Sequence, residues 1–421
     1  MTDKNKSPWN FIPTQYFAEG LPYVIVNTLS VAMYKSLGIS NELIGITSLL
    51  YLPWAIKFLW GPFIDANLTK RKWILMMQLL LGICFTVVAL IIQLPNIFLL
   101  SIIIFTVIAF LSATHDIATD GFYLHALEQK EQAFFTGIRS TFYRFSMVFG
   151  SGLLVTAAGW IGSYYDNNKF GWTLAFLITT SLFILFYFYH KWILPYPETD
   201  KPVRSDNKNI SSVPFFIVFK EYFKQPKIGV ILAYILLYRF GEGLMLKMAQ
   251  PFFLDSHKNG GLNLSLEEVG IMYGTFGVMA LLAGGILGGW LIKKFSLKKL
   301  IWYYALAMNI PCLLFVYMAF TFPNHYIIQI CIIVEQFGYG LGFTAYMVYL
   351  LYISKGEFKT SHYAISTGLM AFGMMIPGLL SGFIQNEVGY FLLFVISFLC
   401  TIPGMITIFF LPIYESNENK I

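Results

Sequence analysis

Ten ionisable side chains interrupt stretches of this 421-residue sequence that are otherwise apolar enough to cross a membrane. The five acids are Glu19, Asp116, Asp120, Glu242 and Glu335, and the five bases are Lys57, Arg139, Arg144, Arg239 and Lys247. A charge in hydrocarbon is costly, so such side chains normally face a wet cavity or one another. Their pattern therefore predicts a path for an ion or a polar solute, with the acids as candidates for proton coupling and the bases as their charge partners.

Asp116 and Asp120 lie one helical turn apart and share a face with Tyr123, a candidate substrate contact. The next apolar stretch returns through the same layer and carries Arg139 and Arg144. Two carboxylates that face two guanidiniums can form a fixed ion-pair lock. They can also form a proton site, in which an arginine keeps one carboxylate charged while desolvation favours protonation of the other.

The first apolar stretch presents Glu19, Tyr23 and Asn27 along one stripe, and Pro22 predicts a kink there. Tyr23 and Asn27 are candidate substrate contacts. Glu335 shares a later stretch with Tyr346, another candidate, because an aromatic ring beside hydrogen-bonding groups suits a sugar.

The seventh stretch combines Tyr238, Arg239, Glu242, Lys247 and Gln250. Arg239 and Glu242 are spaced to pair within one helix, which would leave them mutually neutralised. Lys247 is a candidate ligand for a substrate carboxylate or for the acid of the first stretch. Tyr238 and Gln250 are candidate substrate contacts.

The composition places these residues in a membrane protein, since 57% of the residues are hydrophobic, 12% are charged and the mean hydropathy is +0.66. Windows of about 20 apolar residues predict helices rather than barrel strands. The twelve predicted spans are 11–35, 42–64, 73–93, 97–124, 132–162, 171–193, 227–254, 266–291, 300–322, 325–353, 361–385 and 389–412. The fold class is thus an all-α membrane protein with twelve transmembrane helices.

The two halves of the sequence repeat one another. Residues 17–21 recur as 240–244, and the pattern of Ser, Glu, Gly and Ile at 40–46 recurs at 265–271. The loop 61–72 has its counterpart after the eighth span. We therefore expect a six-helix bundle at 1–193, a cytoplasmic linker at 194–226 and a second bundle at 227–421. The stretch 214–224 of the linker is amphipathic, and is either a surface helix or a simple lead-in to the seventh span.

Two such bundles resemble the major facilitator superfamily, in which the substrate site lies near the midplane between the halves. In that fold the first, fourth, seventh and tenth helices line the cavity. All five acids fall on the predicted counterparts of those helices.

Charge in the loops predicts the orientation. If both termini are cytoplasmic, nearly all Lys and Arg of the short loops lie on their side, and only Lys35, Lys169 and Lys258 lie on the other. The net charge of +6 then reflects topology and contact with the lipid bilayer, and we expect no nucleic-acid partner.

Several segments resemble the AmpG muropeptide permease branch of the superfamily, which belongs to the peptide, acetyl-CoA and drug transporter family. They are FAEGLP at 17–22, YLPWAIKFLWGP at 51–62, SATHDIATD at 112–120, YRFGE at 238–242 with PFFL at 251–254, and the glycines at 368 and 378–382. The resemblance implies proton-coupled import of N-acetylglucosaminyl-anhydro-N-acetylmuramyl peptides across a bacterial inner membrane for cell-wall recycling. It also implies a gating loop that contains Asp65 and Arg71.

Two departures accompany this resemblance. His115 stands where the family pattern has glutamine, and it is either a titratable group beside the acids or a neutral, hydrogen-bonded histidine. The best-known members also carry two extra spans between the halves, which a polar linker does not supply.

The sequence has no nucleophile elbow, phosphate-binding loop or metal-ligand spacing, and its four cysteines fit buried apolar positions. We therefore expect no enzyme activity, cofactor or metal, and a monomer that transports a glycopeptide or sugar together with protons. The alternatives are a proton-coupled exporter of drugs or metabolites, an importer of another sugar, and a membrane sensor without turnover.

Overall fold

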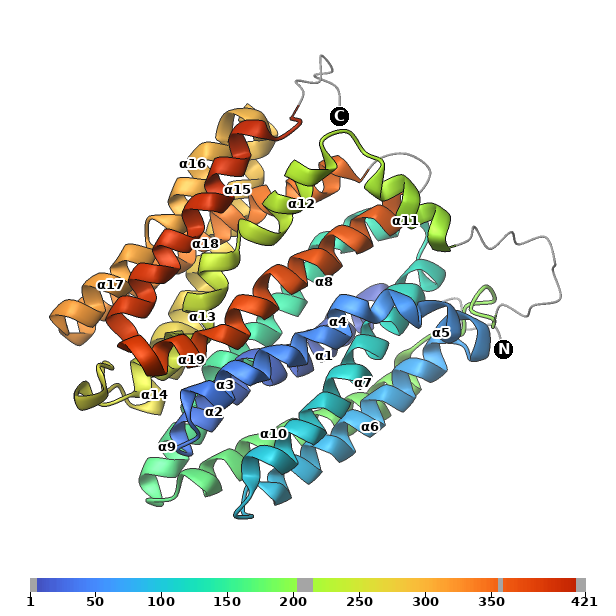
Figure 1. Ribbon diagram of the computed structural model, residues 1–421. Helices are drawn as coiled ribbons and strands as arrows, with labels where there is room; N and C mark the ends of the chain where they lie inside the picture. The colour runs from blue at the N-terminus through green and yellow to red at the C-terminus, as the bar shows by residue number, and fades with distance from the viewer. Residues whose placement is uncertain (1–5, 203–214, 355–358, 414–421) are drawn as a thin grey trace. The chain divides into compact units, whose positions relative to one another are not determined.

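The computed structural model describes residues 6–202, 215–354 and 359–413, and within these ranges the chain is helical with no β-strand (Figure 1). Ten helices of this described part are long and apolar enough to cross a membrane. They are Asn41–Leu59, Lys70–Ile91, Ile97–Ala126, Phe134–Tyr164, Asn168–Ile193, Ile228–Leu254, Leu266–Phe295, Leu297–Thr321, His325–Ile353 and His362–Phe410.

These ten helices account for most of the twelve predicted spans. His362–Phe410 contains two of them, because its backbone leaves the helical region at Gly389, where φ is 75° and ψ is 172°. The remaining predicted span is the continuous helical run 12–36. The prediction of an all-α membrane protein is confirmed.

The chain forms two compact units. Unit 1 consists of Met1–Ile39, Leu50–Ile210 and Ser265–Thr275, and unit 2 consists of Ser40–Leu49, Ser211–Leu264 and Phe276–Ile421. The chain passes from one unit to the other within the expected linker, of which residues 203–214 lie outside the described part. The division at 1–193, 194–226 and 227–421 stays a prediction.

Unit 1 is built from long helices and several short helical segments. They are α1 (Ile12–Val24), α2 (Ser30–Ser36), α4 (Leu52–Ile56), α5 (Gly61–Asn67), α6 (Lys70–Ile91), α7 (Ile97–Ala126), α8 (Gln129–Met147), α9 (Val155–Tyr164), α10 (Asn168–Ile193) and α14 (Leu266–Val269). Side chains define their starts: Thr69 accepts a hydrogen bond from the Lys72 amide at α6, and Asn167 accepts one from the Phe170 amide at α10. Within the unit, α6 packs against α7 and α10, and α1 packs against α7 and α8.

The first span is irregular where the sequence contains proline. Pro22 lies inside α1, and a π-helical turn, Ile25–Leu29, separates α1 from α2. Because proline has no amide hydrogen, the Ala18 carbonyl loses its usual helical partner. The kink predicted from Pro22 thus corresponds to a local change of helix type, and Asn27 lies within the π turn.

Unit 2 has the same helical character. Its elements are α3 (Asn41–Ile46), α11 (Phe215–Phe223), α12 (Ile228–Leu237), α13 (Phe240–Leu254), α15 (Val278–Phe295), α16 (Leu297–Asn309), α17 (Cys312–Thr321), α18 (His325–Ile353) and α19 (Lys359–Thr407). Glycine allows α15 and α18 to approach closely: a Cβ on Gly284 would collide with the Phe337 carbonyl, and one on Gly340 with the Leu281 carbonyl.

The helix α11 ends in a docked tyrosine. The Tyr222 side chain is buried, and its hydroxyl lies 2.8 Å from the Ser366 hydroxyl of α19. This burial raises the pKa of Tyr222. The C-terminal end of α11 is therefore attached to α19 of unit 2.

Two short segments belong to a different unit from the residues that flank them in the sequence. In unit 1, the Ser163 hydroxyl of α9 donates to the Glu267 carboxylate of α14 at 2.6 Å. In unit 2, the Asn41 amide of α3 donates to the Gln385 side chain of α19 at 2.6 Å. These segments, 40–49 and 265–275, contain the repeated Ser-Glu-Gly-Ile pattern, which therefore marks the same kind of packing position in both halves.

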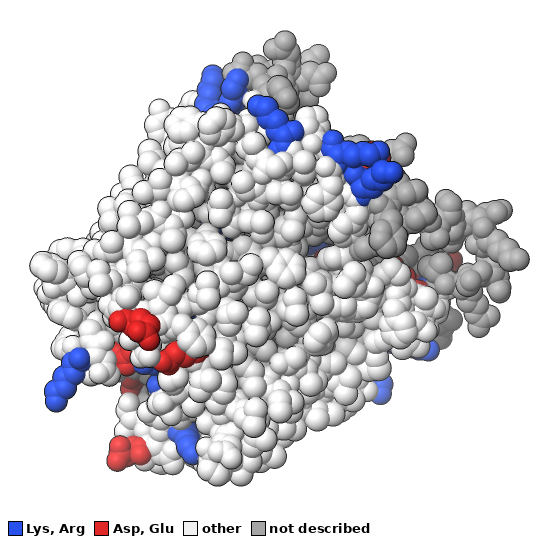
Figure 2. Space-filling view, in the orientation of Figure 1, with Lys and Arg blue, Asp and Glu red and all other residues white. Residues whose placement is uncertain are grey.

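The surface agrees with a membrane location. In Figure 2 most of the visible surface is uncharged, and the Lys, Arg, Asp and Glu side chains occupy only small parts of it. Large apolar side chains such as Leu90, Ile286 and Phe320 are more than half exposed. Exposed apolar surface of this extent needs lipid rather than water around it.

Candidate functional site

Asp116 on α7 forms an ion pair with a lysine of the second span. Lys57 Nζ lies 3.4 Å from Asp116 Oδ2, and Asp116 is only 6% exposed. The other carboxylate oxygen, Oδ1, is buried without a hydrogen-bond partner among the described residues. A buried acceptor without a donor is unfavourable, so this oxygen is a natural place for a proton or a ligand donor.

Asp120, one turn further along α7, is held more completely. Its Oδ1 accepts hydrogen bonds from Arg139 Nη1 and from the Tyr16 hydroxyl, each at 3.1 Å. The same guanidinium lies over the Tyr123 ring, 4.9 Å from its centre, which favours the cation. Although the Asp120 side chain is 51% exposed, its two donors hold it in a fixed cluster.

Tyr123 and Arg144 have other environments than the sequence suggested. The Tyr123 hydroxyl donates to the Gln132 carbonyl, and the face of its ring packs against the Arg139 guanidinium. Arg144 on α8 makes no ion pair with an acid in the described part of the chain. The expected layer of two carboxylates and two guanidiniums is thus replaced by two separate pairs, and Lys57 takes the place given to Arg144.

Glu19 lies next to both pairs. It is buried on α1, and its Oε2 has no hydrogen-bond partner within the described ranges. Its electrostatic neighbours are Asp116, Asp120, Lys57 and Arg139. Unit 1 therefore gathers three acids and two bases, and Glu19 is the acid without a direct ion pair among the described residues.

Tyr23 and Asn27 lie beside each other on the first span. The Asn27 amide donates to the Tyr23 carbonyl at 3.0 Å, while its Oδ1 is buried without a partner in the described chain. The Tyr23 ring meets Trp54 edge-on, with 5.1 Å between ring centres, and Tyr51 at 6.0 Å. These two rings of the second span were not among the candidates, although the sequence YLPWAIK contains both.

In unit 2, Arg239 and Glu242 form a fork. Arg239 Nε donates to one carboxylate oxygen at 3.0 Å and Nη2 donates to the other at 2.8 Å. The Tyr339 hydroxyl accepts a further bond from Nη2 at 2.7 Å, and the guanidinium lies 4.8 Å from the Phe343 ring centre. Both charges are buried. The structure thus contains the Arg239–Glu242 pair within one helix that the three-residue spacing allows.

Lys247 lacks such a partner. It is 7% exposed on α13, and its Nζ makes no hydrogen bond to the described residues. Gln250, one turn further, has a buried Oε1 that is likewise unpartnered in that part of the chain. The Lys247 ammonium is a suitable ligand for a carboxylate, whereas the amide oxygen of Gln250 accepts hydrogen bonds and suits a hydroxyl or N–H group of a solute.

The other candidates of unit 2 are more firmly packed. Glu335 is fully buried and accepts a 2.8 Å hydrogen bond from Gln336. Tyr238 and Tyr346 stack with 5.2 Å between ring centres, and the Tyr346 hydroxyl donates to the Ile235 carbonyl at 2.7 Å. Both tyrosines belong to the hydrophobic core of unit 2, which gives them a packing role.

The two residues of the expected gating loop have different partners. Asp65 forms an ion pair with Lys70. Arg71 donates to the Lys191 carbonyl at 2.6 Å and to the Leu194 carbonyl at 3.3 Å, and so caps the end of α10.

Asp200 completes this junction. Its two carboxylate oxygens accept from the backbone amides of Lys70, at 2.7 Å, and Arg71, at 3.1 Å, at the start of α6. A carboxylate at a helix start stabilises the exposed amides and the helix dipole.

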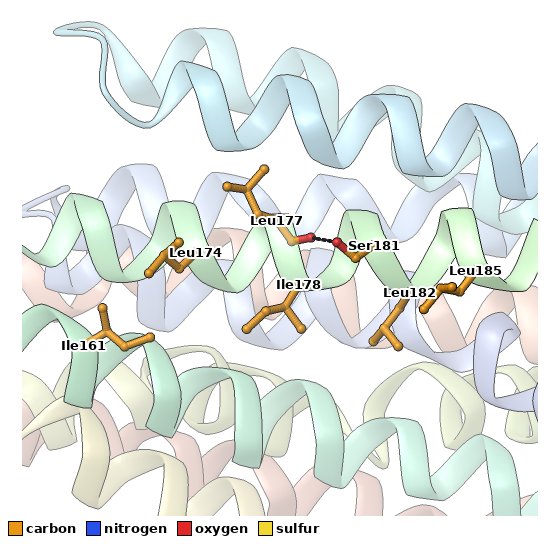
Figure 3. A pocket seen from close by; sticks show the side chains of 7 residues that line it. All are labelled: Ile161, Leu174, Leu177, Ile178, Ser181, Leu182 and Leu185. Atoms are coloured by element: carbon orange, nitrogen blue, oxygen red, sulfur yellow. Dashed lines mark hydrogen bonds between the residues drawn. The ribbon is translucent and has the colours of Figure 1, made fainter.

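An apolar groove lies on the surface of unit 1 (Figure 3). Its lining residues are Ile161, Leu174, Leu177, Ile178, Ser181, Leu182 and Leu185, from α9 and α10. The only hydroxyl, that of Ser181, donates to the Leu177 carbonyl at 2.9 Å. This groove suits a lipid chain and offers no charged ligand to a polar solute.

Comparisons with known proteins agree with this arrangement. A sequence model of the Major Facilitator Superfamily matches residues 15–361. The chain is 26% identical to "Putative transporter AmpG 2" of Rickettsia typhi over 414 residues, covering 96% of this chain and 95% of that protein. It is 24% identical to the "Anhydromuropeptide permease" of Escherichia coli K12 over 402 residues, covering 93% of this chain and 77% of the longer relative.

Among solved structures, the D-xylose-proton symporter superposes with a TM-score of 0.72, at 12% identity and with 96% of each chain covered. The resemblance to AmpG permeases is therefore confirmed at the level of sequence, and the fold is that of transporters rather than enzymes. This chain belongs to the major facilitator superfamily and is a multi-pass membrane transporter of small molecules.

Proposed function

We propose that this transporter is a proton symporter that imports muropeptides, N-acetylglucosaminyl-anhydro-N-acetylmuramyl peptides, or related glycan fragments for cell-wall recycling. The observation that carries the proton coupling is the ion pair of the buried Asp116 with the partly exposed Lys57, in which one carboxylate oxygen makes no hydrogen bond to the described residues. The names of the relatives support the substrate class.

Asp116 is the favoured proton site because its charge is the less completely compensated of the two acids on α7. It has one ion-pair contact of 3.4 Å with a lysine and an interaction with the Trp54 side chain, whereas Asp120 has two hydrogen bonds of 3.1 Å and an arginine stacked on a ring. Protonation of Asp116 removes the charge that attracts Lys57, so the ammonium is released. A proton thereby changes a contact between α7 and the second span.

Glu19 extends this coupling, since it is near both pairs and has an unpartnered oxygen in the described part of unit 1. In unit 2, Arg239 already neutralises Glu242, and Glu335 is hydrogen-bonded to Gln336. We therefore assign proton coupling to unit 1 and leave substrate recognition to other groups.

Lys247 is the proposed ligand for a carboxylate of the peptide part, and the Gln250 amide oxygen is the proposed acceptor for one of its N–H groups. Tyr23 and Asn27, with Trp54 beside them, offer a ring face and an amide to a sugar. Stacking on an aromatic ring and hydrogen bonds to hydroxyls are the interactions that a sugar ring needs.

The oligomeric state, membrane and orientation that we propose are those expected from the sequence. We propose a monomer in a bacterial inner membrane, with both termini and the linker 194–226 in the cytoplasm between bundles 1–193 and 227–421. The excess of Lys and Arg on one side supports this orientation.

Uptake in membrane vesicles tests the proposal. Labelled N-acetylglucosaminyl-1,6-anhydro-N-acetylmuramyl tripeptide is offered to vesicles with and without an imposed pH gradient. We expect accumulation only with the gradient, loss of accumulation in Asp116→Asn, and no effect of Glu198→Gln, a control on an exposed linker residue. Uptake that is indifferent to the gradient and to Asp116→Asn contradicts proton symport, and export of a drug or uptake of a different sugar contradicts the substrate class.

A further inference from the structure

A chain of hydrogen bonds crosses the buried interior of unit 1 beside the acids. The Thr14 hydroxyl of α1 lies 2.9 Å from His190 Nε2 of α10, and His190 Nδ1 lies 3.0 Å from Gln78 Oε1 of α6. Gln78 Nε2 then lies 3.1 Å from His115 Nε2 of α7. These four residues, which we call the histidine–glutamine chain, join four different helices.

The histidine–glutamine chain is satisfied with both imidazoles neutral. In one consistent arrangement, Thr14 donates to His190, His190 donates to the Gln78 carbonyl oxygen, and the Gln78 amide donates to His115. His115 Nδ1 then faces the Thr119 hydroxyl of its own helix at 3.5 Å. The hydrogen positions follow from this network, and Gln78, His115 and His190 have no exposed surface on which an added charge could be solvated.

Three successive residues of α7 are each held by a different neighbour. The Thr114 hydroxyl accepts from Trp60 Nε1 at 3.1 Å, His115 is bonded to Gln78, and Asp116 meets Lys57. Successive residues of an α-helix point about 100° apart. The rotation of α7 about its own axis is therefore determined from three directions, and His115 provides the fully buried one.

The contact of Asp116 with Lys57 is the weakest of these three. It is a single contact of 3.4 Å, at the long limit for a hydrogen bond, and the Lys57 side chain is 36% exposed. A small rotation of α7 would separate the two charges. The hydrogen bonds of His115 and Thr114, about 100° and 200° around the helix from Asp116, oppose such a rotation.

We propose that the histidine–glutamine chain positions Asp116 for proton coupling by fixing the rotation of α7. His115 and Gln78 are positioning residues, and neither carries the transported proton. This inference rests on the proposed function, in which Asp116 is the proton site. It also predicts which substitutions at position 115 are tolerated, because the hydrogen bond and not the imidazole is needed.

Two variants of His115 separate these roles. Glutamine can place an amide group near the position of Nε2, so His115→Gln keeps a bond to Gln78. Leucine has similar bulk and no polar atom, so His115→Leu removes the bond. Thr86→Val is the matched control, since it removes the 3.3 Å bond between α6 and α10 at Thr180 without touching α7.

The first measurement is proton-driven uptake of the labelled anhydromuropeptide by purified protein in liposomes. We expect His115→Leu to lower the maximal rate about ten-fold, the lower end of the loss when a partner that orients a functional side chain is removed. The KM should stay within about two-fold, because the substrate ligands are elsewhere, and His115→Gln and Thr86→Val should retain most of the rate.

The second measurement needs no substrate. Infrared difference spectra of the purified protein, recorded against pH, follow protonation of buried carboxyls, and Asp116→Asn identifies the band of Asp116. We expect the midpoint of this band to move in His115→Leu and to remain unchanged in His115→Gln and Thr86→Val.

The two measurements distinguish the two ideas. A midpoint that moves in His115→Leu, together with uptake that is independent of the pH gradient, overturns the proposed function and supports the positioning role. An unchanged midpoint in a His115→Leu protein that elutes as a single folded species overturns the positioning role, and so does a His115→Gln variant as impaired as His115→Leu.

Discussion

The buried pair of Arg239 and Glu242 gives a prediction that can be worked from the structure. The two side chains are 6% and 2% exposed and share two hydrogen bonds of 2.8 and 3.0 Å. Removing one member of such a pair leaves an uncompensated buried charge, which costs about 3–5 kcal/mol in the free energy of unfolding. Removing both charges together avoids this penalty.

We therefore expect Glu242→Gln to lose about 3 kcal/mol, at the lower limit because Tyr339 still accepts from the guanidinium. Arg239→Met should lose about 4 kcal/mol at neutral pH. The double variant should lose only about 1 kcal/mol, so the coupling energy between the two side chains is about 6 kcal/mol.

The assay is denaturant unfolding of the purified protein in detergent, followed by tryptophan emission, for the four members of the cycle. The double variant should also keep proton-driven uptake, since Arg239 and Glu242 neutralise each other and Asp116 is the proposed proton site. Additive losses would refute the reasoning about the pair. Loss of proton coupling in a stable double variant would instead show that Glu242 carries the proton.

Three further predictions concern other parts of the chain. Lys247→Met should raise the KM for the labelled anhydromuropeptide about ten-fold or more, whereas an analogue with amidated carboxyls should be carried equally well by both proteins. Gly340→Val should destabilise unit 2 by about 1–3 kcal/mol in the same unfolding assay, while Gly289→Ala, where a Cβ meets nothing within 4 Å, should not destabilise it and should add up to about 1 kcal/mol of stability. Asp200→Ala should lower the unfolding free energy by about 1 kcal/mol through loss of the cap on α6, and Glu198→Ala should not.

The membrane-spanning helices could be predicted because each is a long apolar run. Helix type within a span could not, since the π turn at 25–29 depends on how the chain accommodates Pro22 within the packed unit. The close succession of the last two predicted spans could not be predicted either, since they meet at a sharp kink at Gly389, where glycine adopts the positive φ of 75° without strain.

Pairing within one helix could also be predicted. Arg239 and Glu242 are three residues apart, and this spacing alone brings them together. Pairing between helices depends on helix rotation and register, which the sequence does not contain. Asp116 therefore has Lys57 as its partner rather than an arginine of α8.

Aromatic candidates were the least predictable group. Tyrosine suits a sugar site and a packed core equally well, and the sequence pattern is the same for both. The Tyr23 ring meets the Trp54 ring edge-on, whereas Tyr238 and Tyr346 stack inside the core of unit 2. The bond from Gln78 to His115 was equally hidden, because the two residues are 37 positions apart and each alone resembles an ordinary buried polar residue.

The segments 40–49 and 265–275, each of which belongs to the other unit from its flanking residues, determine when each unit is complete during synthesis. Residues 40–49 are synthesised long before the rest of their unit, which begins at residue 211. Unit 1 in turn lacks residues 265–275 until much of the second half has been synthesised. Before that point, the Ser163 hydroxyl of α9 has no Glu267 to receive its hydrogen bond. Neither half is a self-sufficient translation product, and separate expression of the halves would leave each without one of its own helical segments.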